Sequence, residues 1–179
     1  MKKFNQVLIL IFFIGIPSLL YAETKVYFSP NGGCMQAVIT EINKANQSIE
    51  VAMYALTSRE ISHALVEAKN RHVRVRIALN ISQIMDPYSK CKFLESKGLS
   101  VKFHMGPGFL NDKFAVIDNR VVLTGSYNWS LVADRSNFEN LLVIKDRELA
   151  LKYARQFKLL WAKCGQGQIK GPHPEELNN

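Results

Sequence analysis

The sequence is poor in cysteine, with three residues in a chain of 179. Cys34, Cys91 and Cys164 are too few and too far apart for a disulfide scaffold, and they lack the paired spacing of a zinc site. In an oxidising compartment one disulfide could form, and Cys34 and Cys164 would meet if their two helices pack together. Three buried free thiols are the alternative.

Acidic residues are also scarce, since 15 Asp and Glu stand against 23 Lys and Arg, which gives a formal net charge of +8. This excess favours polyanionic partners such as nucleic acid or an acidic membrane, without choosing between them. Hydrophobic residues make up 47% of the chain and charged residues 21%, which excludes a wholly disordered protein. The length is that of one domain, or two at most.

An apolar run over residues 7–20 follows a basic start and ends just before Ala22. This layout predicts a signal peptide over residues 1–22 and export to the periplasm or the cell envelope. A retained N-terminal membrane anchor, with membrane association, is the alternative. The run is short for a membrane span, which needs about 20 residues. Pro17 within it argues against a buried core helix.

Beyond residue 22 the hydrophobic pattern alternates between strands and helices. Helical spacing predicts helices that begin near residues 34, 57, 88 and 147, the second of them opened by a capping box over 57–60. The predicted strands cover residues 24–28, 48–56, 73–77, 100–104, 112–118, 121–126 and 139–145. This order predicts an α/β domain with a mixed β-sheet over residues 23–164, and a flexible C-terminal tail over 165–179.

A group of polar residues with fixed spacing lies in the second half of the chain. Lys113 and Asp118 fall on one predicted strand, and Gly125, Ser126 and Asn128 fall at the end of the next strand and just beyond it. A hairpin would bring Lys113 close to Ser126 and Asn128. A fixed positive charge beside neutral donors suits an oxyanion such as a phosphodiester. Taken one at a time, these residues fit equally well as a surface lysine, a turn aspartate and a polar turn.

Together these residues form the pattern K-x4-D-x6-G-S-x-N, which resembles the signature H-x-K-x4-D-x6-G-S-x-N of the phospholipase D superfamily. The resemblance covers residues 25–161, and this part of the chain looks like the small, single-motif bacterial endonucleases of that superfamily. It implies the phospholipase D-like fold, with helices on both faces of the mixed sheet. It also implies a phosphodiesterase that uses a phosphohistidine intermediate and needs neither a metal nor another cofactor.

The resemblance further implies a role for each motif residue. Lys113 and Asn128 would bind phosphate oxygens, with Ser126 assisting, while Asp118 and Gly125 would hold the motif in place. In the family one histidine attacks phosphorus and a second protonates the leaving oxygen. Single-motif members supply one histidine per chain. Because this chain has one motif and no second copy of any segment, the resemblance implies a two-fold homodimer.

The chain departs from the signature at the nucleophile position, where Asn111 replaces the histidine. The lone pair of an amide nitrogen is delocalised, so Asn111 can neither attack phosphorus nor carry a proton near neutral pH. General acid–base catalysis, worth about 10²–10⁴-fold, would be lost with the covalent route. Glu139 matches the family's glutamate that orients the histidine, and Asn111 would keep a donor for it. The intact remainder favours a recent or deliberate His→Asn replacement that still binds substrate, and a natural non-catalytic member is the alternative.

Single-stranded DNA or RNA is the favoured substrate, and a cardiolipin-type phospholipid is the alternative. Tyr127 and Trp129 could stack on bases, although core packing is the commoner use of such residues. Among the other histidines only His104, which precedes a Gly-rich loop, is a candidate to replace the missing nucleophile. The residues expected to form a basic surface around the site are Arg71, Arg74, Arg76, Lys90, Lys92, Lys97, Lys102 and Arg120.

Overall fold

The computed structural model describes residues 22–165. All but one residue of the predicted signal peptide or anchor, and all but one of the predicted tail, lie outside the described residues. Within residues 22–165 no helix is both long and apolar enough to cross a membrane.

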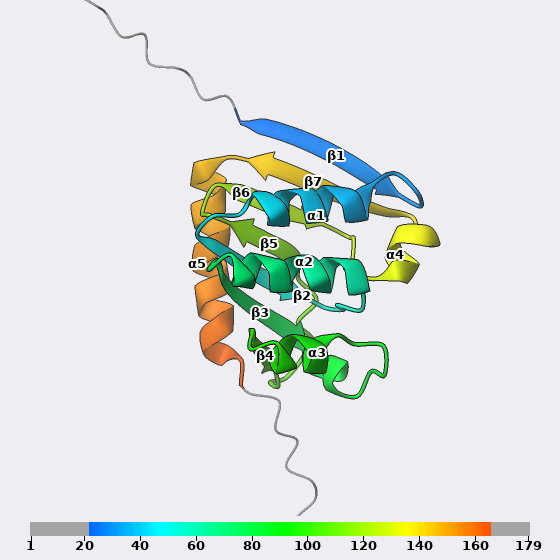
Figure 1. Ribbon diagram of the computed structural model, residues 1–179, viewed down its shortest axis with the longest axis vertical. Coiled ribbons are helices and arrows are strands. Elements are labelled where there is room, and N and C mark those ends of the chain that lie inside the picture. The colour runs from blue at the N-terminus through cyan, green and yellow to red at the C-terminus, as the bar shows by residue number, and fades with distance from the viewer. Residues whose placement is uncertain (1–21, 166–179) are drawn as a thin grey trace, which may run out of the picture.

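A seven-stranded mixed β-sheet forms the middle layer of the domain, in the order β1-β7-β6-β5-β2-β3-β4 (Figure 1). β2, β3 and β4 run parallel to one another, and the remaining neighbours pair antiparallel. The strands are β1 (Glu23–Ser29), β2 (Ser48–Met53), β3 (Arg74–Asn80), β4 (Ser100–His104), β5 (Lys113–Ile117), β6 (Val121–Gly125) and β7 (Glu139–Lys145). The mixed sheet predicted from the sequence is therefore confirmed.

Helices cover both faces of this sheet, as the resemblance implied (Figure 1). α1 (Cys34–Lys44), α2 (Arg59–Asn70) and α3 (Cys91–Ser96) pack on one face, and α5 (Arg147–Lys163) crosses the other. Each face has its own apolar core. The sequence did not predict α4 (Leu131–Arg135) or the 3₁₀ turn Ile81–Ile84. Both are too short to show a helical period.

The sheet separates the cysteines that could have formed a disulfide. Cys34 and Cys91 lie in the core beneath α1, α2 and α3, and Cys164 lies in the core beneath α5. All three are buried free thiols. The prediction that Cys34 and Cys164 might meet is therefore wrong, because their helices pack on opposite faces of the sheet.

One end of each of the seven strands lies at the same side of the sheet, which we call the Lys113 edge. Strand register aligns Lys113 at the start of β5 with Met53 at the end of β2. It also aligns Leu141 of β7 with Gly125 at the end of β6. In Figure 1 this is the edge beside α4. The strand ends and loops at this edge carry Asn111, Lys113, Ser126, Asn128 and Glu139.

Candidate functional site

Lys113 provides the positive charge at this edge of the sheet. Its Nζ donates to the carbonyl oxygen of Asn111 at 2.9 Å and to the Asn111 side-chain Oδ1 at 2.8 Å. The same ammonium lies 5.5 Å from the centre of the Tyr54 ring. Desolvation lowers the pKa of Lys113, while the charges of Glu139 and Asp112 act in the opposite direction. The lysine is thus held beside Asn111 in a partly dehydrated setting.

The loop that carries Asn111 is anchored by a buried asparagine at the end of β3. The backbone N–H of Leu110 donates to Asn80 Oδ1 at 3.1 Å, and Asn80 Nδ2 donates to Ser82 Oγ at 2.7 Å. Asn80 is fully buried, whereas Asn111 is exposed. Sequence reasoning missed Asn80, although a polar residue that ends an apolar strand at this edge was a usable signal.

Asn128 lies in the loop after β6 and reaches the end of β2. Its Oδ1 accepts a hydrogen bond from the backbone N–H of Ala55 at 3.3 Å. Since Lys113 lies over the neighbouring Tyr54, both motif side chains meet the same short segment. The structure therefore brings Lys113 and Asn128 to one place, and leaves the Asn128 amide group as a neutral donor there.

Ser126 is fixed against the first residues of β7. Its backbone N–H donates to the carbonyl of Asn140 at 3.1 Å, and its Oγ accepts from the Asn140 N–H at 3.1 Å. Gly125 precedes it with φ of 148°, and a side chain there would collide with the Asn140 carbonyl. Gly125 therefore permits the close approach of β6 and β7 that positions Ser126.

Glu139 begins β7 at the same edge, but it does not hold Asn111. Its carboxylate accepts from Asn137 Nδ2 at 3.1 Å, and the Asn111 side chain is engaged by Lys113. Between residues 22 and 165 the structure contains no hydrogen bond between Glu139 and Asn111. The expectation that Asn111 would serve as a donor for Glu139 is thus not met. The Asn111 carboxamide instead turns its oxygen towards the lysine.

Asp118 lies at the opposite edge of the sheet from Lys113. Its carboxylate accepts three backbone hydrogen bonds, from Asn46 at 2.9 Å, from Gln47 at 2.7 Å and from Ser48 at 2.8 Å. These bonds tie the turn between β5 and β6 to the connection between α1 and β2. Asp118 cannot touch a substrate bound at Lys113 from this position.

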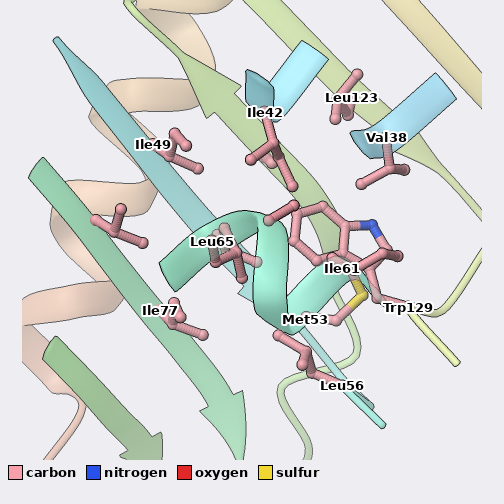
Figure 2. Packing of buried hydrophobic residues seen from close by; sticks show 14 of the residues in the cluster. Val38, Ile42, Ile49, Met53, Leu56, Ile61, Leu65, Ile77, Leu123 and Trp129 are labelled. Atoms are coloured by element: carbon pink, nitrogen blue, oxygen red, sulfur yellow. The ribbon is translucent and has the colours of Figure 1, made fainter. Parts of the chain in front are cut away.

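Tyr127 and Trp129 are core residues with about 1% of their surface exposed. Figure 2 shows Trp129 packed among Val38, Ile61 and Met53 beneath the first two helices. The Tyr127 hydroxyl donates to Asp134 Oδ1 at 3.1 Å, and burial, followed by the charge of Asp134, raises its pKa. The possibility that these rings stack on bases is therefore wrong, because their faces are covered by the core.

His104 ends β4, separated from β5 in the sheet by β3 and β2. Its ring borders a cavity of about 270 Å³ that Phe109 and Asp112 also line. The Nδ1 atom is buried without a hydrogen-bond partner, and Nε2 lies 3.5 Å from the Pro107 carbonyl oxygen. Asp112 is the neighbour of Asn111 in the chain. His104 thus approaches the loop of the site without contacting Lys113 or Asn111.

The predicted basic surface is only partly at this edge. Arg74 and Arg76 pair with the buried carboxylate of Glu50, and Arg120 follows β5 at the opposite edge. Lys90 does lie near the site, since its backbone N–H donates to the carbonyl oxygen of Leu56 at 3.0 Å. Leu56 follows Ala55, which donates to Asn128. Residues 22–165 contain no group of three or more His, Cys, Asp or Glu side chains that could hold a metal ion.

Comparison with known proteins agrees with this geometry. Residues 38–161 match the family described as "Cardiolipin synthase, PLD-like domain". A phospholipase D of Rickettsia felis is 34% identical over 142 residues, which are 79% of this chain and 71% of that protein. A mitochondrial cardiolipin hydrolase of Xenopus laevis is 34% identical over 124 residues, which are 69% of this chain and 59% of that protein.

The fold comparison points the same way. The crystal structure of Nuc, a phospholipase D family member from Salmonella typhimurium, superposes with a TM-score of 0.77 at 28% identity. The match covers 80% of this chain and 97% of that chain. With a family model that matches residues 38–161, a relative that is 34% identical and the same layered sheet, this chain belongs to the phospholipase D superfamily of phosphodiesterases.

Proposed function

We propose that this protein binds the phosphodiester backbone of single-stranded nucleic acid at the Lys113 edge of the sheet, and that Asn111 prevents it from cleaving the bound strand. The observation that carries the proposal is the 2.8 Å hydrogen bond between Lys113 Nζ and Asn111 Oδ1. This bond supports the proposal because it holds the Lys113 ammonium directly beside Asn111, which occupies the histidine position of the signature. A phosphate oxygen would take the place of the Asn111 oxygen on the ammonium.

In the active form of such a site, residue 111 is a histidine. Its ring nitrogen forms a bond to phosphorus as the bond to the leaving oxygen breaks, and that oxygen takes a proton from the histidine of a second protomer. Water then gives a proton to the same second histidine and displaces the first one from phosphorus. Lys113 and Asn128 stabilise the charge that develops on the phosphate oxygens. Asn111 supplies neither the nucleophile nor the proton.

The second protomer is part of the proposal. This chain carries one motif, and its likeness to Nuc extends over 97% of that chain. A two-fold homodimer would place two copies of the Asn111 loop face to face and complete the site.

The origin of Asn111 is a separate question. The other motif residues are all present, which supports a replacement of histidine in an otherwise functional enzyme; they are Lys113, Asp118, Ser126 and Asn128. A natural non-catalytic binder is the alternative, and the codon for residue 111 in the source gene distinguishes the two.

The choice of nucleic acid over lipid rests on charge, and the choice of a single strand rests on the expectation that a paired site would form a narrow groove. The chain has a formal net charge of +8, and phosphate-rich strands are the polyanions that such proteins attract. A cardiolipin-type phosphodiester is the second candidate, because a cardiolipin hydrolase is among the relatives. We also propose that the protein acts in the periplasm or at the cell envelope, because its N-terminal sequence resembles a signal peptide.

The test is a binding titration of the purified protein with a labelled single-stranded oligonucleotide and, in parallel, with cardiolipin-containing vesicles. Tight oligonucleotide binding, which weakens steeply with salt and is lost in Lys113→Ala, is expected. Lys158→Ala, an exposed lysine on α5, is the matched control and should bind normally. Binding to the vesicles alone would replace the nucleic-acid proposal with the lipid one.

A further inference from the structure

A second cavity, which we call the side pocket, lies next to the candidate site and has a volume of about 670 Å³. It is formed where the start of α2, the segment after the 3₁₀ turn and the start of α4 come together. In Figure 1 this is the end of the molecule at which α4 lies. The residues of its wall that bear on its chemistry are Arg59, Asp86, Tyr88, Lys90, Leu131 and Val132.

The wall of the side pocket is attached directly to the motif. The carbonyl oxygen of Trp129 accepts from the N–H groups of Thr57 at 3.0 Å and Ser58 at 2.9 Å. Asn128, one residue earlier, accepts from Ala55. Residues 55–58 therefore contact the phosphate-binding motif at one end and line the side pocket at the other. The side pocket and the Asn128 loop therefore share this short segment of backbone.

An aromatic ring and two aliphatic side chains give the side pocket an apolar part. Tyr88 is 74% exposed, Val132 61% and Leu131 42%. Rings with this degree of exposure are free to stack, in contrast to the buried Tyr127. Asp86 holds the Tyr88 segment in place, because its carboxylate accepts from the Tyr88 N–H at 2.9 Å and from a glutamine amide at 3.2 Å.

The side pocket carries two cations, Arg59 and Lys90, and two carboxylates, Glu60 and Asp86. Its acidic residues are engaged locally, Asp86 as above and Glu60 with the Ser58 hydroxyl at 3.1 Å. Arg59 and Lys90 take part in none of the salt bridges formed within the part of the chain that the structure describes. An aromatic face, an apolar wall and two cations that form none of these salt bridges are complementary to the base and the phosphate of a nucleotide. An acyl chain would have to desolvate these charges on binding.

We propose that the side pocket binds the nucleotide next to the phosphodiester held by Lys113 and Asn128. The base contacts Tyr88 and the edge formed by Leu131 and Val132, and the phosphate of that nucleotide meets Lys90 and Arg59. This inference rests on the proposed function and deepens it. It makes the side pocket the part of the protein that distinguishes a nucleic acid strand from a small phosphodiester.

The experiment compares the affinity of variants for a labelled single-stranded oligonucleotide. Tyr88→Ala should raise Kd by about 5- to 150-fold, since stacking of one base is worth about 1–3 kcal/mol. Lys90→Ala should reduce the slope of log K against log salt by about 0.7, the value for one phosphate contact in a single strand. A strand with an abasic position placed next to the bound phosphodiester should bind the wild type as weakly as Tyr88→Ala binds the intact strand.

The controls separate this inference from the proposed function. Lys158→Ala and Leu159→Ala change exposed residues of α5 and should keep wild-type affinity. If Lys113→Ala weakens binding but Tyr88→Ala and Lys90→Ala do not, the side pocket is not a nucleotide site and the proposed function stands. If the wild type binds no oligonucleotide, both proposals fail. Loss of vesicle binding in the side-pocket variants, with oligonucleotide binding intact, would overturn the assignment in favour of a lipid.

Discussion

Replacement of Asp118 tests whether this residue stabilises the fold around the motif or takes part in the site itself. Its carboxylate accepts hydrogen bonds from three consecutive backbone N–H groups. Hydrogen bonds to a charged group contribute about 1.5–3 kcal/mol each, but water can replace the partner of the exposed N–H groups. Loss of all three should therefore lower the free energy of unfolding by about 2–4 kcal/mol.

The choice of replacement changes the expected size of the effect. Asp118 has φ of 52°, a left-handed conformation that Ala tolerates poorly and Asn tolerates well. The free energy of unfolding of Asp118→Ala should thus fall by a further ~1–2 kcal/mol, which gives a total decrease of about 3–6 kcal/mol. Asp118→Asn keeps Oδ1, which accepts from Gln47 and Ser48, and should lose only about 1–2 kcal/mol.

Urea unfolding followed by circular dichroism measures these changes, and oligonucleotide titration of the folded protein measures binding. Folded Asp118→Asn should bind the strand with wild-type affinity, because Asp118 lies at the far edge of the sheet from Lys113. A folded Asp118→Asn protein of normal stability that no longer binds would refute the reasoning. It would place the aspartate in the site despite its distance from the other motif residues.

Three further predictions follow from the same structure. Oligonucleotide affinity should fall as pH rises through the pKa of Lys113, which desolvation lowers, so the fall should begin at a lower pH than in Lys113→Arg. Cys34, Cys91 and Cys164 should not react with Ellman's reagent in the native protein, since they are buried and burial raises the pKa of Cys34 to about 11. All three should react after unfolding without reductant, and a single reactive thiol would reveal a disulfide. Sedimentation should show a dimer at micromolar concentration, and a stable monomer would contradict the paired site.

Much of the fold followed from local pattern. The strands Ser100–His104 and Glu139–Lys145 and the helix Arg147–Lys163 were predicted with their observed ends, because regular apolar spacing marks them clearly. The strand predicted over 48–56 stops at Met53 instead, since the chain leaves the sheet to form the floor of the site. Local spacing does not reveal where a strand loses its neighbour.

The candidate site was predicted in its residues but not in its contacts. Fixed motif spacing identified Lys113, Ser126 and Asn128, and the hairpin placed them at one edge. The contacts of Tyr54 with Lys113 and of Asn80 with Leu110 join segments far apart in the sequence, so no local signal announced them. The burial of Tyr127 and Trp129 depends on tertiary packing, so the local sequence did not reveal it.

The most direct test of the account is the cleavage activity of Asn111→His in the presence of EDTA. Two histidines would then face each other in the proposed homodimer, beside Lys113, and the proposed metal-independent route would be complete. We expect the parent protein to bind single-stranded nucleic acid without cutting it, and the variant to cut it in chelator. Lys113→Ala in the same background should abolish the cleavage, and an excess of parent chains should suppress it by forming dimers with one histidine. A folded, dimeric Asn111→His protein that cleaves neither nucleic acid nor cardiolipin would contradict the claim that position 111 alone separates this chain from an active enzyme.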